Sequence, residues 1–77
     1  MLTIKQETYS VTNGKITIVK TVTVYESEDA QKAEANFIDR VRTLKLYHHY
    51  DERMLEGVVL CTPNKNVRYS RFGNFLS

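Results

Sequence analysis

Two adjacent histidines lie between tyrosines in the segment from Tyr47 to Asp51. Imidazole and carboxylate groups bind metals and carry protons, so this segment is the first place to look for chemistry. Successive helical residues point about 100° apart, so His48 and His49 cannot both reach one ion while the helix continues. The only thiol, Cys61, has no zinc-motif spacing to either histidine. We expect no metal and no cofactor, and interpret the segment as a helix end whose rings cover a sheet edge.

Catalysis by Cys61 would need a nearby base and an exposed, activated thiol. Cys61 instead follows a run of Val and Leu, where cysteine usually serves as a small hydrophobic residue. Acidic residues gather around residues 26–34, where the start of a helix favours them. We therefore predict that the chain is not an enzyme.

Cations and aromatic rings alternate between Lys65 and Phe72. A surface of this kind neutralises phosphates and stacks on bases, as in single-stranded nucleic-acid binding. On a strand, Arg68 shares a face with Phe72, and Tyr69 shares the other with Arg71. A basic edge strand also discourages aggregation between sheets, so both interpretations stay open. With the cations of the helix, the predicted nucleic-acid site comprises Arg40, Arg42, Lys45, Lys65, Arg68, Tyr69, Arg71 and Phe72.

Asn13-Gly14 separates two segments of alternating apolar residues, 2–11 and 15–25, which predicts a long β-hairpin. The turn is either a two-residue type I′ loop or a three-residue loop from Thr12 to Gly14. The longer loop pairs Ile4 with Val22 and turns the even-numbered residues of both strands to one face. The shorter loop scatters the apolar residues over both faces. We therefore predict the three-residue loop, with a core face of Leu2, Ile4, Ile16, Ile18, Val22 and Val24.

The odd-numbered face of this hairpin is rich in threonine and tyrosine. A single helix covers one side of a sheet, so this face is left to solvent, to a second copy of the chain or to a protein partner. Tyrosine is favoured at protein interfaces. The hairpin also offers an edge to which a partner or a second copy can add a strand. The predicted protein-contact surface comprises Tyr9, Thr17, Val19, Thr21, Thr23 and Tyr25.

A helix is predicted over residues 28–47, with Ser27 as its cap and an apolar stripe that includes Ala33, Phe37, Val41 and Leu44. A second hairpin follows over residues 57–72. Its four-residue loop, 63–66, places Leu60 opposite Tyr69. The expected fold is α+β, in the order ββαββ: an antiparallel sheet of about four strands packed on one face by a single helix. We expect one domain, 1–77, consisting of hairpin 2–25, helix 28–47, hairpin 57–72 and a loose tail, 73–77.

The composition is that of a globular protein, with 42% hydrophobic and 26% charged residues in 77. The net charge of +2 is below that of a dedicated nucleic-acid binder. One cysteine, with no targeting or membrane-spanning segment, predicts a cytoplasmic location.

We therefore expect a small non-enzymatic binding protein that occupies a macromolecular surface as an inhibitor or adaptor. Its size resembles that of accessory proteins encoded by phages or mobile elements, including those of the anti-defence type, although no motif carries this likeness. The expected partner is a protein, and homodimerisation is a further expectation. The alternative is an RNA or single-stranded nucleic-acid-binding domain that uses the basic, aromatic strand.

Overall fold

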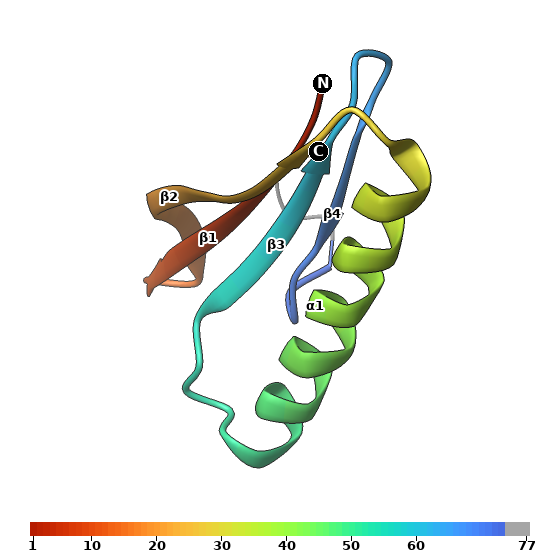
Figure 1. Cartoon of the computed structure of the whole chain (residues 1–77). Coiled ribbons are helices and arrows are strands. Elements are labelled where there is room, and N and C mark those ends of the chain that lie inside the picture. Colours follow the sequence, from red (N-terminus) through yellow and green to blue (C-terminus); the bar gives the residue numbers. More distant parts are fainter. Residues whose placement is uncertain (74–77) are drawn as a thin grey trace.

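A computed structural model describes residues 1–73 of the chain. Four strands form one antiparallel sheet in the order β2-β1-β3-β4, and a single helix, α1, lies against one face of it (Figure 1). The elements follow the order ββαββ. The predicted α+β fold is confirmed. The part of the predicted tail beyond Gly73 lies outside the described residues.

The first hairpin joins β1 (Leu2–Thr12) to β2 (Lys15–Ser27) through Asn13 and Gly14 alone. These two residues have φ angles of 53° and 77°, the left-handed pair that a type I′ turn requires. Asparagine and glycine tolerate this conformation best, which explains why they lie at the turn. The prediction of a three-residue loop is wrong.

β2 contains two bulges, and they change which face its residues occupy. The pairing shifts between Ile18 and Lys20, and again between Thr23 and Tyr25, which leaves Val19 and Val24 as extra residues. Each extra residue exchanges the faces of the residues that follow it. The apolar residues of β2 are therefore divided between the two faces of the sheet, and the predicted common core face does not form as one set.

The division can be followed through the partners in β1, because directly opposed residues share a face. Ile18 opposes Tyr9, on the side away from α1. Val22 opposes Gln6, on the side of α1. The prediction that Ile16 and Ile18 face the helix is therefore wrong, whereas that for Val22 is correct.

The helix α1 (Ala30–Tyr50) begins two residues later and ends three residues later than predicted. Its cap is Asp29, whose carboxylate accepts hydrogen bonds from the amides of Gln31 and Lys32. Ser27 instead accepts from the amide of Asp29 and orients the cap. An ionised carboxylate at the positive end of the helix is a stronger acceptor than a hydroxyl, so Asp29 prevails over Ser27.

The main core lies between α1 and the sheet. Ala33, Phe37 and Leu44 of the helix pack on Ile4 of β1 and on two residues of β3, Val58 and Leu60. These positions follow the helical and strand periods that the sequence predicts. These contacts hold α1 over β1 and β3, the two central strands of the sheet.

The second hairpin joins β3 (Glu56–Cys61) to β4 (Asn66–Tyr69). Leu60 opposes Val67 rather than Tyr69, so the predicted register is displaced by two residues. The hydroxyl of Thr62 accepts from the amides of Asn64 and Lys65 and closes the loop one residue earlier than predicted. A shift of two residues preserves the faces. Of the residues predicted to point inward, Val58 and Leu60 are in the core and Tyr69 packs against it, whereas Val67 is exposed.

Candidate functional site

Tyr9, predicted to lie on an open face, is 2% exposed. Its hydroxyl donates to the Glu7 carboxylate at 3.1 Å, and its ring meets that of Phe72 edge-on at 6.2 Å. The tyrosine side chain lies over Gly57, which leaves room for it because glycine has no Cβ. Burial and the neighbouring carboxylate of Glu7 raise the pKa of Tyr9 well above its ordinary value. Tyr9 is thus part of a second, smaller core.

Tyr25, expected on the same open face as Tyr9, lies on the other side of the sheet. The bulge at Val24 places it opposite Ile4, where it packs against the main core. The single open face that joined Tyr9 to Tyr25 therefore does not exist. The premise of that surface is wrong, because the sequence pattern alone does not reveal where a bulge reverses the faces.

The remaining predicted contact residues stay exposed on β2. They are Thr17, Val19, Thr21 and Thr23. Val19 is 61% exposed, and Val22, which the prediction placed in the core, is 44% exposed. β2 is an edge strand of 13 residues, and no strand within residues 1–73 pairs with its outer side. What the four residues share is an edge rather than a face.

The hydrogen-bonding direction of this edge follows from Tyr9. Its amide donates to the carbonyl of Leu55 at 2.8 Å, so it points toward β3 and away from β2. Opposed residues in an antiparallel pair point their amides in opposite directions when they do not bond to each other. Ile18 lies opposite Tyr9, and Ile16 lies two residues earlier. Both therefore point their N–H groups away from β1, toward the side of β2 that no strand within residues 1–73 covers. Together with Val19, these amides form the β2 edge, the first candidate site.

The basic strand has a different environment from the one predicted. Arg68 donates from Nε and Nη2 to the two carboxylate oxygens of Glu7, at 2.8 and 3.1 Å. The carboxylate is nearly inaccessible, with a side-chain exposure of 4%. These hydrogen bonds to Glu7 raise the pKa of Arg68. Arg68 is therefore committed to the smaller core. The sequence prediction missed Glu7, although its position two residues before Tyr9 places both on one face.

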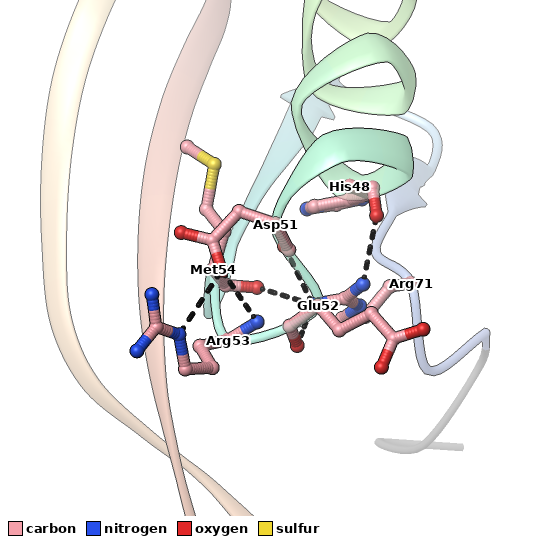
Figure 2. Close-up of polar contacts among 6 residues, drawn as sticks. All are labelled: His48, Asp51, Glu52, Arg53, Met54 and Arg71. Carbon is pink, nitrogen blue, oxygen red and sulfur yellow. Dashed lines mark hydrogen bonds and ion pairs between the residues drawn. The ribbon is translucent and has the colours of Figure 1, made fainter.

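Arg71 binds the chain that leaves α1 (Figure 2). Its Nη2 donates to the carbonyl of His48 at 3.1 Å, and its Nη1 donates to that of Met54 at 3.0 Å. The carbonyls of Asp51 and Glu52 accept from the same Nη1 atom. A guanidinium that satisfies carbonyls at a helix end is a capping device. This contact holds the loop after α1 against the turn at residues 71–72.

The rings of the basic strand are also used internally. The hydroxyl of Tyr69 is 3.1 Å from Nδ1 of His48, and the two rings stack at 5.7 Å. The ammonium of Lys45 lies 5.7 Å from the centre of the Tyr69 ring. Phe72 contacts Tyr9. The predicted alternation of faces along this strand is correct. Its cations and rings nevertheless contact other residues of the fold, as seen for Arg68, Tyr69, Arg71 and Phe72.

Of the other predicted nucleic-acid residues, Arg40 donates from Nε to the amide oxygen of Asn36 at 2.7 Å. Arg42 and Lys65 are exposed. They are the cations of the predicted site whose side chains take no part in the hydrogen bonds, ion pairs and ring contacts described for residues 1–73. The predicted site does not come together as a single basic surface.

His48 is buried and uses both ring nitrogens in the fold. Its Nε2 is 3.1 Å from the carbonyl of Glu56, which can only accept, so Nε2 carries the proton and Nδ1 accepts from the hydroxyl of Tyr69. Burial, and next the charge of Arg71, lower the pKa of His48 below its usual value. His48 is therefore a neutral structural residue, and the adjacent His49 is exposed.

Metal ligands do not cluster in the described part of the chain. No group of three His, Cys, Asp or Glu side chains within residues 1–73 has an arrangement that would hold an ion. Cys61 is partly buried and opposes Thr3 in β1. Within the same residues, no helix has both the length and the apolar character needed to cross a membrane.

Comparison with known proteins found no matching family model, no matching curated protein and no matching solved structure.

Proposed function

We propose that this chain is a non-enzymatic binding protein that adds an extended segment of a protein partner to its sheet along the β2 edge. The observation that carries the proposal is the free edge itself, with the outward amides of Ile16 and Ile18 beside exposed Val19. In strand addition, main-chain hydrogen bonds supply affinity and exposed side chains supply specificity. The β2 edge offers both.

The composition of this edge favours a protein over a nucleic acid. Between residues 16 and 25, Lys20 is the one charged residue, and the others are mainly threonine and valine. Nucleic-acid affinity depends on several cations that face the phosphates together. Arg68 and Arg71 instead bind Glu7 and carbonyls at the end of α1 and in the loop after it. A protein segment is therefore the better-supported partner.

Such a protein acts by covering a surface, as an inhibitor or adaptor of the kind that phages and mobile elements encode. It works in the cytoplasm, where the free thiol of Cys61 persists. The segment that β2 accepts belongs to another protein or to a second copy of the chain. The oligomeric state of the purified protein decides between these two.

The test removes one outward amide without disturbing the ladder with β1. Proline at an edge position whose N–H faces solvent leaves the sheet intact, so Ile16→Pro abolishes one donor at the free edge. Ile16→Ala is the matched control, because it shortens the same side chain and keeps the amide. The wild-type protein and both variants are used to capture partners from the native host, after nuclease treatment. Each captured protein is then titrated in purified form.

We expect nuclease-resistant capture by the wild type, an affinity at least about tenfold weaker for Ile16→Pro, and near-wild-type affinity for Ile16→Ala. Native folding of the proline variant is checked by circular dichroism. Capture that disappears with nuclease, or binding that the proline leaves unchanged, would contradict the proposal.

A further inference from the structure

A groove with a volume of about 390 Å³ lies between α1 and the sheet, apart from the β2 edge. This volume is within the range of roughly 300–1,000 Å³ typical of small-ligand sites. Its helical wall consists of residues at three- and four-residue spacing: Asn36, Asp39, Arg40, Thr43, Leu44 and Tyr47. Its floor includes Gln6 and Val58, which oppose each other in β1 and β3. The groove therefore runs along the helix, and its walls come from three elements.

One end of the groove carries the guanidinium of Arg40, and the exposed Asp39 also lines the groove there. Arg40 is partly buried, and its Nε donates to Asn36, which fixes the plane of the guanidinium. The terminal amino groups of Arg40 make no hydrogen bond to another residue within 1–73. A guanidinium held by one edge presents its remaining donors as a fork that matches a carboxylate.

The other end carries a carboxylate and an aromatic ring, those of Glu56 and Tyr47. His48 binds the carbonyl of Glu56, so Glu56 lies beside the last turns of α1, next to Tyr47. The carboxylate of Glu56 forms no ion pair with any residue that the structure describes. Met54 lines the same end, and its carbonyl is held by Arg71, as Figure 2 shows. An acid beside an exposed tyrosine ring is a favourable place for a cation.

The two ends are separated by the length of two helical turns. Arg40 and His48 are eight residues apart, about 12 Å along the axis. Between them the buried side chains of Leu44 and Val58 give an apolar floor. An extended arginine has about 7 Å between its carboxylate and its guanidinium, which is less than this rise and leaves room for the side chains of Arg40 and Glu56 at its two ends. The groove thus matches an elongated molecule with an anion, an aliphatic stem and a cation in that order.

We propose that this groove binds a carboxyl-terminal arginine or lysine. Its carboxylate pairs with Arg40, its stem lies over Leu44 and Val58, and its cation lies between Glu56 and the ring of Tyr47. Two sources share this chemistry, the free amino acid and the end of a polypeptide. The groove is separate from the β2 edge, so binding in it does not depend on the proposed function.

Nuclear magnetic resonance titration of the ¹⁵N-labelled protein tests the proposal with the peptide acetyl-Gly-Gly-Arg. We expect saturable shifts at groove residues with a Kd of about 0.1–1 mM. The amidated peptide, which lacks the carboxylate, should bind at least about tenfold more weakly. A parallel titration with free arginine identifies the source: equal affinity indicates the amino acid, and weaker binding indicates the polypeptide end.

Variants identify the two ends of the site. Arg40→Gln should weaken the free-acid peptide at least about tenfold, and Glu56→Gln at least about threefold. Arg42→Gln changes an exposed cation on the same helix that does not line the groove, and should leave the Kd unchanged. Spectra of each unliganded variant confirm its fold. The absence of saturable shifts up to about 5 mM, or equal binding of the amidated peptide or of Arg40→Gln, would overturn the proposal.

Discussion

The β2 edge and the segment after β3 differ in how far their side chains are used by the fold itself. Residues 66–72 look like a binding surface in the sequence, yet their charged and aromatic side chains hold the fold together. β2 carries Val19 and a series of threonines on a free edge. The segment with the stronger chemical signature is therefore internal, and the plainer one is available to a partner.

This difference has a physical origin in the size of the chain. A 77-residue protein buries a small core, so long polar side chains that cover and cross-link the sheet make a large contribution to stability. Arg68 and Arg71 each connect the end of the chain to a distant element. In a protein this small, a cation beside an aromatic ring is evidence of a structural contact as much as of a nucleic-acid site.

The largest expected effect comes from breaking the buried ion pair. Arg68→Ala leaves the Glu7 carboxylate uncompensated in a site that is almost inaccessible, which should lower the free energy of unfolding by about 3 kcal/mol. Urea denaturation measures this loss. The double variant Glu7→Met, Arg68→Met should recover most of it, because no charge is then left buried. If Arg68→Ala were as stable as the exposed control Arg42→Ala, the internal role of the basic strand would be refuted.

A somewhat smaller loss is expected for Arg71. Arg71→Ala removes the charged donor from the carbonyls of His48, in the last turn of α1, and Met54, in the loop after it, and should lower the free energy of unfolding by about 2 kcal/mol. Arg71→Lys keeps the charge but not the fork, so it should recover only part of the loss. Amide hydrogen exchange should show faster opening of residues 51–54 in the alanine variant. Unchanged exchange at residues 51–54 would show that Arg71 does not stabilise this loop.

These two predictions change how nucleic-acid binding is tested. An Arg68→Ala, Arg71→Ala variant that loses binding proves little, because both substitutions destabilise the fold. Arg42 and Lys65, which are exposed, are the informative positions. A steep salt dependence that weakens when these two are replaced would favour the nucleic-acid alternative.

A pH dependence is expected from His48. Its pKa is lower in the folded protein than in the unfolded chain, so near pH 6.5 the unfolded chain binds more protons. The stability that neutral His48 contributes is therefore fully present above this pH and is lost as the pH falls below it. His48→Gln should flatten the melting temperature between about pH 7 and pH 5, and exposed His49→Gln should not. Equal pH profiles for the wild type and His48→Gln would show that protonation of His48 does not affect stability, which would contradict the prediction.

The periodic apolar positions in the sequence predict the fold. The register of the strands, and the faces that depend on it, are not predicted. The stripe of Ala33, Phe37 and Leu44 and the alternation of Val58 and Leu60 indicate the core correctly. The prediction for the turn at Asn13-Gly14 is wrong because alternation alone does not reveal a bulge. The extra residues Val19 and Val24 divide the apolar residues of β2 between two faces, whereas the prediction assumed one.

The candidate site was predictable only in part, because partners distant in sequence decide whether a side chain is free. Glu7 and Arg68 are 61 residues apart, and only the order β2-β1-β3-β4 brings them together. Val19 was predicted to be exposed from the alternation along residues 15–25, and it is 61% exposed although the face assumed for it does not form. The groove at Arg40 was missed because its residues come from three separate elements.

The smallest effect on stability is expected at the β2 edge. Val19 is 61% exposed and is the extra residue of a bulge, so it contributes little buried area. Val19→Lys should change the free energy of unfolding by no more than about 0.5 kcal/mol, measured by urea denaturation. The same substitution places a charge where a partner strand would pack and should disrupt strand addition. A loss above about 2 kcal/mol would mean that Val19 belongs to the core, and the contrast between a free edge and an internal basic strand would then fail.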